Sequence, residues 1–537
     1  MSKVSTYLQS HVVGEVSTRT DVRQAFSTDG GVLRIEPEMV IYPRATNDIR
    51  KVARFSWQLA EKGHPLAITA RGGGTDAVGA ALGKGVVLAL APHMHTIFEY
   101  DAKQKLVRLQ PGTSIDSLTQ ALGLHGATVH VLQGSHGIGT VGGAIANATG
   151  GMYAGVSTLL DTVDQLEVVL ANGDVLQTER ISKRELSKRK GKEGFEGDIY
   201  RGIDGIIEEY ADVISTIPSG DYTGYSSIAD VRRKDGSFDL APLFIGSQGT
   251  LGIITEMILK VEARSEHRSA VALVFKSREV ARDAIDALQA LNPQLLEYID
   301  GAFYDQALKA GKSYAFYTAD SKAAAVVIVG FENASERLVK KSLKRLEKAF
   351  GNHEGVHLMH FDSKHRAELA SALDVVRYIS APDQTDVVAP ALYTGVGIPL
   401  SRLEEFCQGL EALATKERID LPMAGHVTTG IYGVYPLLSL KKVGDKQKIL
   451  KLVDALATLV GSVDGTLIAE GGEGILKSRA VRARLDPKLV EMYDAIRKVF
   501  DPYDTLNPGV KQDVDLKTLA GYLRNEPSVG DFSRFGL

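Results

Sequence analysis

The chain has 537 residues, of which 44% are hydrophobic and 24% are charged, so it can bury sizeable cores and is long enough for more than one domain. Its net charge of −4 gives no electrostatic reason to expect a nucleic acid as its partner. The single cysteine, Cys407, excludes an internal disulfide and an iron–sulfur cluster held by cysteines of this chain.

Hydropathy predicts a soluble, cytoplasmic protein without an integral membrane segment. The first residues, Met1–Tyr7, lack a charged region followed by an apolar one. No run of eighteen or more apolar residues occurs anywhere in the chain. A reducing compartment also suits a protein with one cysteine.

The first predicted elements are a helix and a glycine-rich loop. Apolar residues recur with helical spacing from Asn47 to Lys62. The apolar run Pro65–Ile68 then leads into the loop Ala70–Asp76, which contains three consecutive glycines. Glycines let the backbone reach positive φ and approach a ligand closely, so that successive N–H groups can converge on an anion. The loop has neither the G-x-G-x-x-G spacing of nicotinamide-binding proteins nor the Gly-Lys-Ser/Thr of a P-loop, so both of those sites lose support.

Three short strands and a second glycine-rich segment follow. Apolar runs bounded by turn residues predict strands at Gly85–Leu90, Lys105–Leu109 and Gln165–Leu170. The second glycine-rich segment, Thr140–Gly151, lies between the last two strands. Either glycine segment alone could be a simple turn. Together they predict a cradle for a pyrophosphate.

The run Lys183–Glu193 concentrates positive charge. Glu185 and Glu193 interrupt it, which favours a solvated insertion loop over a nucleic-acid patch. It is also the one stretch whose charge would suit peripheral contact with a membrane surface. Beyond it, helical spacing from Ile203 to Ile214 predicts another helix.

A change of composition at Arg264–Arg268 predicts the start of a second domain. Strand-like runs at Ala270–Phe275 and Ala324–Val329 flank an amphipathic helix at Ser277–Leu291. Strands that alternate with helices in this way fit an α+β unit. Near the end of the chain, a short helix is predicted from Leu516 to Leu523.

Further segments fall in the order of a known family. They are Ser27–Asp29, Ile41–Pro43, Gly224–Tyr225, Gly246–Glu256 and Phe500–Gly509. Together with the two glycine segments, they resemble FAD-binding oxidoreductases of the vanillyl-alcohol oxidase (PCMH) type, in the branch of the D-lactate dehydrogenases and glycolate oxidase subunits. The resemblance runs from about residue 20 to residue 511.

This resemblance implies a two-part α+β architecture. A PCMH-type FAD-binding domain would span residues 1–263 and be completed by residues 481–511. A cap domain, an antiparallel sheet flanked by helices, would span residues 264–480, and residues 512–537 would form a tail. In the resembled family the cap covers the flavin and supplies most substrate contacts.

The resemblance also implies FAD held largely by backbone groups. Some relatives tether FAD to a histidine after the glycines, whereas this chain has Thr75, so the cofactor is expected to be non-covalent. The residues expected at the cofactor are Pro43, Arg71, Gly72, Gly73, Gly74, Thr75, Asp76, Ser135, Thr140, Gly142, Gly143, Asn147, Gly150, Gly151, Gly249, Ile254 and Asn507.

For the substrate, the segment Leu373–Arg377 is similar to the place where D-2-hydroxy-acid dehydrogenases carry an arginine that grips the substrate carboxylate. The planar fork of Arg377 suits that task because it can pair with a carboxylate through two hydrogen bonds. The competing interpretation is a surface arginine on a helix.

The chain departs from the resembled branch at the positions expected for the base and the metal ligands. That branch carries Gly-His-x-Gly-Asp-Gly-Asn-x-His and a later Gly-Glu-His-Gly. This chain keeps His426 and Glu470, but Gly433 and Gly471 replace the other histidines. Two ligands are too few for a tight zinc site, so no firmly bound catalytic metal is predicted. His426 is the candidate base, against the alternative of a histidine hydrogen-bonded within the domain. Other candidates are Tyr432, Tyr435 and Glu473.

The sequence therefore predicts a FAD-dependent dehydrogenase or oxidase that acts on a small CH–OH substrate. The most specific form of this prediction is a D-2-hydroxy acid whose carboxylate is held by Arg377. One alternative is an enzyme for an alcohol or amine without a carboxylate. Another is a catalytically inactive flavin-binding subunit of an electron-transfer complex. The electron acceptor is open among oxygen, a quinone, a cytochrome and a partner protein.

Overall fold

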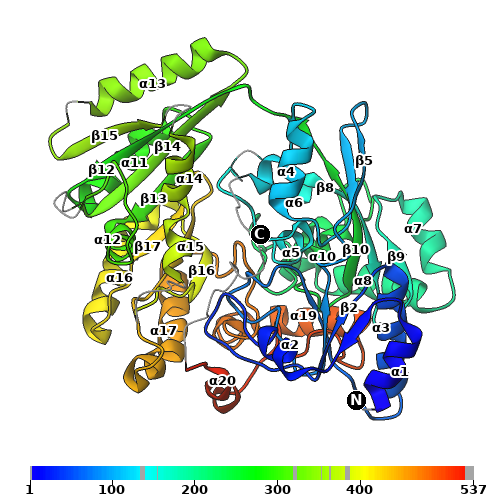
Figure 1. The fold of residues 1–537 in the computed structure, drawn as a ribbon. Helices are drawn as coiled ribbons and strands as arrows, with labels where there is room; N and C mark the ends of the chain where they lie inside the picture. The colour runs from blue at the N-terminus through cyan, green and yellow to red at the C-terminus, as the bar shows by residue number, and fades with distance from the viewer. Residues whose placement is uncertain are drawn as a thin grey trace.

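The computed structural model describes residues 3–133, 139–153, 155, 157–318, 323–351, 353–361, 365–380 and 387–525. Figure 1 shows two halves side by side, one of them formed by the N-terminal elements. The other half, here called the cap, contains the elements from β12 (His267–Phe275) to α17 (Val443–Ser462). Mixed helices and sheets in both halves confirm the predicted α+β fold.

The first sheet of the N-terminal half contains three parallel strands. Its order is β1 (Glu15–Ser17), β2 (Met39–Tyr42), β4 (Val86–Ala89) and β3 (Ile68–Arg71). The parallel strands β2, β4 and β3 are almost wholly buried, which is why they appear in the sequence as continuous apolar runs. Helix α3 (Thr46–Ala60) packs Ile49 and Val52 into the same core, confirming the predicted helix.

The second sheet is antiparallel and joins distant parts of the chain. Its order is β5 (Ile97–Asp101), β6 (Leu106–Leu109), β10 (Ile253–Lys260), β8 (Val163–Val169) and β9 (Val175–Gln177). Helix α19 (Pro487–Phe500) packs against α8 (Phe195–Glu209) in the core of this half. Leu506 then forms a parallel bridge with Ile68. The chain thus returns to the N-terminal half after completing the cap.

The cap is built on a seven-stranded antiparallel sheet. Its order is β15 (Val356–Phe361), β12, β14 (Ala325–Asn333), β13 (Leu295–Asp300), β17 (Met423–His426), β18 (Ile431–Val434) and β16 (Tyr393–Gly397). Alternate residues of β12 enter different cores: Leu273 joins one and Ala272 the other. Helices α11 (Arg278–Gln289), α13 (Glu336–Phe350), α16 (Leu403–Glu417) and α17 cover one face, and α12 (Gly301–Lys309) and α15 (Val375–Ser380) cover the other.

The prediction of a solvated loop at Lys183–Glu193 is wrong, because most of this segment is helical. The run Lys183–Glu193 contains helix α7 (Lys183–Lys190), whose N-terminus is capped because the Ser182 hydroxyl accepts a hydrogen bond from the Glu185 N–H. Arg189 pairs with Glu179 and Glu196. These ion pairs neutralise part of the positive charge of this segment, which in the sequence looks unpaired.

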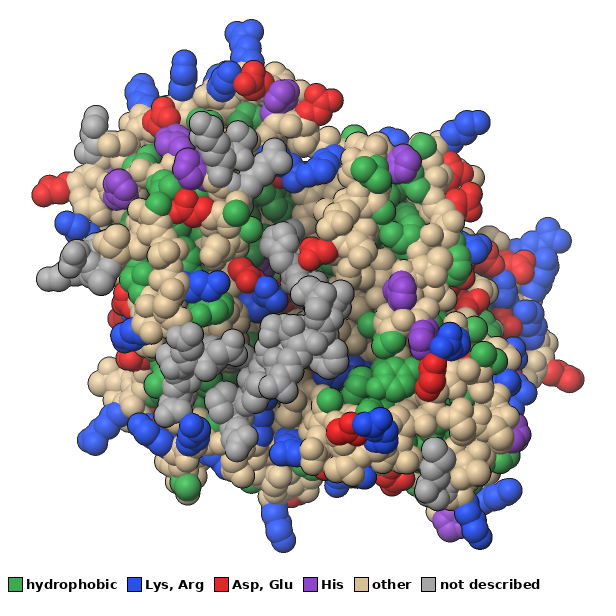
Figure 2. All heavy atoms as spheres, viewed as in Figure 1, with side chains coloured by type: hydrophobic (Ala, Val, Ile, Leu, Met, Phe, Trp, Pro, Cys, Tyr) green, Lys and Arg blue, Asp and Glu red, His purple; other side chains and the backbone are tan. Residues whose placement is uncertain are grey.

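Helix α13 carries six exposed basic residues on its outer side, together with the exposed Glu336 and Glu347. Val339, Leu346 and Phe350 pack on the cap core. Figure 2 shows Lys and Arg side chains projecting along the upper edge of the molecule, where Figure 1 places this helix. Its exposed basic residues are Arg337, Lys340, Lys341, Lys344, Arg345 and Lys348.

The other elements are short. They are α1 (Lys3–His11), α2 (Thr20–Ala25), α4 (Ile115–Gly123), β7 (Ala127–Thr128), η1 (His130–Leu132), α5 (Val141–Ala146), α6 (Leu159–Thr162), α9 (Ala211–Ile214), η2 (Ser226–Asp230), α10 (Ala241–Phe244), β11 (Glu262–Ala263), α14 (Arg366–Leu373), η4 (Leu400–Arg402), α18 (Ser478–Arg482) and α20 (Leu516–Tyr522). Among the described residues, no helix is both long and apolar enough to cross a membrane.

Candidate active site

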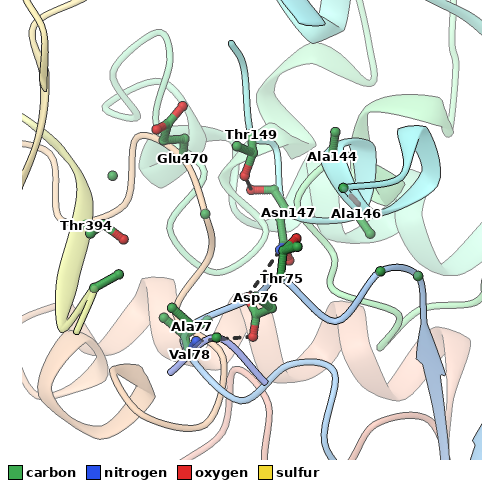
Figure 3. Close-up of a pocket in the computed structure, with 18 of the residues that line it drawn as sticks. Thr75, Asp76, Ala77, Val78, Ala144, Ala146, Asn147, Thr149, Thr394 and Glu470 are labelled. Atoms are coloured by element: carbon green, nitrogen blue, oxygen red, sulfur yellow. Dashed lines mark hydrogen bonds between the residues drawn. The ribbon is translucent and has the colours of Figure 1, made fainter. Parts of the chain in front are cut away.

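A cavity of about 710 Å³ lies between the two halves. The N-terminal half contributes both glycine segments and residues 247–254, and the cap contributes residues of β13, α15, β16, β17 and β18. In Figure 3, Thr394 of the cap lies apart from Asp76 and Asn147 of the N-terminal half, and Glu470 lies beside Thr149. Residues far apart in the sequence therefore line one cavity.

The two glycine segments contact each other directly. A Cβ atom added to Gly72 would overlap the Thr140 hydroxyl, and one added to Gly74 would overlap the Arg71 guanidinium. Gly74 also has a φ of +71°, which side chains rarely tolerate. The first loop can adopt this shape only because residues 72 and 74 lack side chains, and the backbone there is therefore left open to the cavity.

The second glycine segment begins a short helix. Thr140 caps α5, with its hydroxyl accepting a hydrogen bond from the Gly143 N–H at 3.2 Å. A Cβ atom on Gly142 would lie 2.8 Å from the Pro111 carbonyl oxygen. One on Gly151 would overlap the Gln133 carbonyl oxygen. These glycines allow the close packing that keeps the segment against the cavity wall.

Side-chain amides connect the loops behind this wall. Asn147 Nδ2 donates to Asp76 Oδ1 at 3.2 Å, a bond drawn in Figure 3, and Gln248 Nε2 donates to Asn147 Oδ1 at 3.0 Å. Asn507 Nδ2 donates to the carbonyl oxygens of Ala80 and Gln248, each at 2.7 Å. Asn507 thus supports the wall from behind and does not line the cavity.

Most residues expected at the cofactor line this cavity. Pro43 and Asn507 do not, and Ser135 lies outside the described residues. The residues that do line it are Arg71, Gly72, Gly73, Gly74, Thr75, Asp76, Thr140, Gly142, Gly143, Asn147, Gly150, Gly151, Gly249 and Ile254.

His426, which is partly buried, pairs with the buried Glu297. Pairing of β13 with β17 places the two residues opposite each other, and Nδ1 of His426 lies 2.7 and 2.8 Å from the two carboxylate oxygens. Burial alone would lower the pKa of His426, but Glu297, assisted by Glu470, raises it to about 9. Burial raises the pKa of Glu297, an effect that His426 opposes. The remaining ring nitrogen, Nε2, has no hydrogen-bond partner in the described part of the chain.

Glu470 reaches the same cavity with few partners. Its Oε2 accepts a hydrogen bond from the Gly150 N–H at 3.3 Å, and burial raises its pKa. Gly471 has a φ of +73°, and a Cβ atom there would meet nothing within 4 Å. Within the described residues, no group of three or more His, Cys, Asp or Glu side chains is arranged to hold a metal ion.

Arg377 lines the cavity, but its fork is already occupied. Nε and one terminal nitrogen donate to the two oxygens of Asp374 at 2.6 and 2.8 Å, one turn earlier. This contact raises the pKa of Arg377 further above its usual value. The guanidinium therefore faces the cavity with a carboxylate already bound.

Two of the three other candidate bases, Tyr432 and Glu473, differ in their surroundings. Tyr432 lines the cavity, but its hydroxyl is buried with no hydrogen-bond partner among the described residues. Glu473 does not line the cavity; it forms an ion pair of 2.6 Å with the buried Lys511 and accepts the Gly224 N–H. Glu473 thus has a structural role, connecting Lys511 and Gly224 away from the cavity.

Sequence reasoning missed Glu297 and Lys477. Glu297 is a carboxylate in a strand whose residues are all buried, and that mismatch is a signal that could have been used. Lys477 is fully buried and donates to the Thr394 carbonyl oxygen at 3.0 Å, directly behind the cavity wall. Burial lowers the pKa of Lys477 to about 8.

The donor set fits FAD. A dinucleotide needs close backbone approach and converging N–H groups at its pyrophosphate, and here the packed glycines and the capped start of α5 supply both. The polar cluster of the cap borders the same space, where a substrate could lie beside the cofactor.

Comparison with known proteins agrees with this fit. Residues 37–179 match the family described as "FAD binding domain", and residues 264–510 match "FAD linked oxidases, C-terminal domain". The solved structure of 4-ethylphenol oxidase from Gulosibacter chungangensis has a similar fold, with a TM-score of 0.67 at 14% identity, covering 96% of this chain and 97% of that one.

Curated relatives are more similar in sequence. D-2-hydroxyglutarate dehydrogenase of Pseudomonas putida is 27% identical over 92% of this chain, which spans about half of that relative's length (50%). Glycolate oxidase subunit GlcD of Bacillus subtilis is 24% identical, with 88% of each chain covered. A probable mitochondrial D-lactate dehydrogenase of Danio rerio is 24% identical, covering 92% of this chain and 88% of that one. The chain belongs to the family of FAD-linked oxidoreductases with a PCMH-type FAD-binding domain, and its cofactor is FAD.

Proposed function

We propose that the protein oxidises the CH–OH group of a small D-2-hydroxy acid. The observation that carries this proposal is the single cavity that joins the glycine cradle to His426, Glu470 and Arg377. The curated relatives are named as D-2-hydroxyglutarate dehydrogenase, D-lactate dehydrogenase and glycolate oxidase subunit, and all three names refer to 2-hydroxy acids. FAD supplies the hydride acceptor when bound.

His426 is the proposed proton acceptor. Glu297 holds Nδ1, which leaves Nε2 available to take the proton of the substrate hydroxyl. The imidazolium formed would be stabilised by Glu297 and by the nearby Glu470, the same interactions that raise the pKa of His426. Those carboxylates make His426 a stronger base than an isolated imidazole.

Arg377 is the proposed holder of the substrate carboxylate. Two parallel N–H donors match the two oxygens of a carboxylate, and Asp374 already demonstrates this geometry. Substrate must therefore compete with Asp374 or share the guanidinium with it. That competition would weaken binding in the free enzyme and favour substrates with a full negative charge.

The first test uses flavin absorbance under anaerobic conditions. Addition of a D-2-hydroxy acid should bleach the oxidised flavin of the purified holoenzyme. A protein that stays yellow with every acid in a panel would contradict the proposed activity and favour an inactive flavin-binding subunit. Bleaching by simple alcohols or amines alone would favour an enzyme for substrates without a carboxylate.

A second test addresses Arg377. We expect Arg377→Ala to raise KM for the acid by roughly 10- to 100-fold, because a hydrogen-bonded ionic contact is lost. Asp374→Asn should lower KM, because it removes the competing carboxylate. Arg402→Ala is the control, since Arg402 pairs with Glu405 and Asp464 on the cap and does not line the cavity. An unchanged KM in Arg377→Ala would contradict the carboxylate clamp.

We also propose that the enzyme acts in the cytoplasm and passes electrons to an acceptor outside this chain. A buried lone cysteine, Cys407, is compatible with a reducing compartment. Stopped-flow oxidation of the reduced enzyme by oxygen, a soluble quinone and cytochrome c would rank these acceptors. A rate with oxygen far below those with the other two would mark a dehydrogenase.

A further inference from the structure

Tyr435 lies on the face of the cap sheet that borders the cavity. Pairing of β17 with β18 places His426 opposite Ile431 and Ala424 opposite Gly433. Because side chains alternate along a strand, His426, Gly433 and Tyr435 belong to one face. Tyr432 belongs to the other face and joins the other core of the cap. Tyr435 and His426 both line the cavity.

The ring of Tyr435 fills the space that Gly433 leaves. A Cβ atom added to Gly433 would lie 2.9 Å from the Tyr435 ring and 3.0 Å from its hydroxyl oxygen. On another side, Phe303 packs against the ring edge to face, with centroids 5.3 Å apart at 82°. The absence of a side chain at residue 433 and these contacts fix the position of the hydroxyl.

The hydroxyl of Tyr435 has a free hydrogen-bonding capacity. None of the described residues forms a hydrogen bond with it. Burial raises the pKa of Tyr435, and the carboxylates of Glu470 and Glu297 raise it further, so the hydroxyl keeps its proton and can donate. A half-buried donor on a cavity wall is stabilised when a ligand supplies the acceptor.

We propose that Tyr435 is a further catalytic residue whose hydroxyl donates a hydrogen bond to the C2 oxygen of the substrate, which rests on the proposed oxidation of a 2-hydroxy acid. His426 takes the proton of that oxygen, and Tyr435 stabilises the negative charge that develops there. Arg377 binds the carboxylate attached to C2. Tyr435 thereby recognises the oxygen at C2, and Arg377 recognises the acid.

The test separates recognition of the C2 oxygen from recognition of the carboxylate. Oxidised holoenzyme is titrated with pyruvate, which has an oxygen at C2, and with propionate, which lacks it, and binding is followed by the change in flavin absorbance. The variants are Tyr435→Phe, which keeps the ring, and Tyr393→Phe. Tyr393 also has a buried hydroxyl without a partner among the described residues, but it does not line the cavity.

We expect Tyr435→Phe to raise Kd for pyruvate about tenfold, the cost of one neutral hydrogen bond, and to leave Kd for propionate unchanged. Its kcat/KM for D-lactate should fall at least as much. Tyr393→Phe should match the wild type in all three measurements. Gly433→Ala, which displaces the ring while keeping the hydroxyl, should reproduce the loss for pyruvate.

Three results would overturn the inference. Equal weakening of pyruvate and propionate by Tyr435→Phe would show that the ring only shapes the cavity. Wild-type turnover and wild-type pyruvate binding in Tyr435→Phe would remove Tyr435 from the site while leaving the proposed function intact. If the wild type neither binds any acid nor is reduced by one, the proposed function fails and the inference fails with it.

Discussion

At the scale of single residues, two side chains from distant parts of the sequence form an ionisable pair in this cavity. Glu297 and His426 are 129 positions apart, yet strand pairing brings a carboxylate oxygen to 2.7 Å from Nδ1. The glycines at 433 and 471 have opposite local effects: the Tyr435 ring fills the space beside the first, and open space adjoins the second. The two glycines at this site therefore have different structural roles: Gly433 makes room for the Tyr435 ring, whereas Gly471 leaves open space.

The pH dependence of turnover tests the His426 pair. Because His426 must be neutral to accept a proton and its pKa is about 9, kcat/KM of the wild type should rise with pH up to about 9. Glu297→Gln removes the main charge that raises this pKa, so the inflection should move down by more than one pH unit. The measurement is kcat/KM for a D-2-hydroxy acid from pH 5 to 10.

Glu256→Gln is the matched control for this profile. Glu256 is also a carboxylate on a strand and forms an ion pair with a basic residue, Arg108, but it does not line the cavity. Its inflection should coincide with that of the wild type. An unchanged inflection in Glu297→Gln, or a wild-type rate that falls towards pH 9, would remove His426 from the role of base.

Among the elements, α20 has a larger role than its position near the end of the chain suggests. Leu519 is buried in the main core of the cap, which also includes Val32 and Leu33 of the N-terminal half. Leu523 forms a bridge with Leu33, and the Arg524 N–H donates to the Val32 carbonyl oxygen. Helix α20 thus joins the two halves near the first glycine loop.

Substitutions on α20 test this bridging role. We expect Leu519→Ala to lower the free energy of unfolding by about 2–5 kcal/mol, because it leaves a cavity in the core. Leu516→Ala should change it by less than about 0.5 kcal/mol, since Leu516 is half exposed on the same helix. Chemical denaturation of both variants measures the difference. Equal effects of the two substitutions would mean that α20 does not hold the halves together.

The sequence predicted elements better than contacts between them. The strands Gly85–Leu90 and Ala270–Phe275 correspond to β4 and β12, because their apolar runs are local signals. Helix α7 was missed because its charges are satisfied by Glu179, Glu196 and Asp204, which only the fold brings close. The glycine cradle was predictable from consecutive residues. The Glu297–His426 pair depends on strand register, which no short segment of sequence reveals.

At the scale of the whole molecule, the two halves border the cavity proposed for FAD, and the residue at the position predicted for covalent attachment cannot bond the flavin. Thr75 lines the cavity where some relatives are expected to carry a histidine. Denaturation with acid should therefore release all of the flavin into the supernatant as FAD. Chromatography of supernatant and pellet measures this. Flavin fluorescence that remains with the protein on a denaturing gel would contradict a non-covalent cofactor.

The route of the chain between the halves also sets an order of events during synthesis. The cap sheet comes from one continuous stretch, β12 to β18, whereas the N-terminal half needs α19 and Leu506 to complete its core. At translation rates of about 5–20 residues per second, the ribosome needs roughly 10–50 s to pass from β11 to Leu506. The half that emerges first therefore cannot complete its core, or close the proposed FAD site, until Leu506 has left the ribosome.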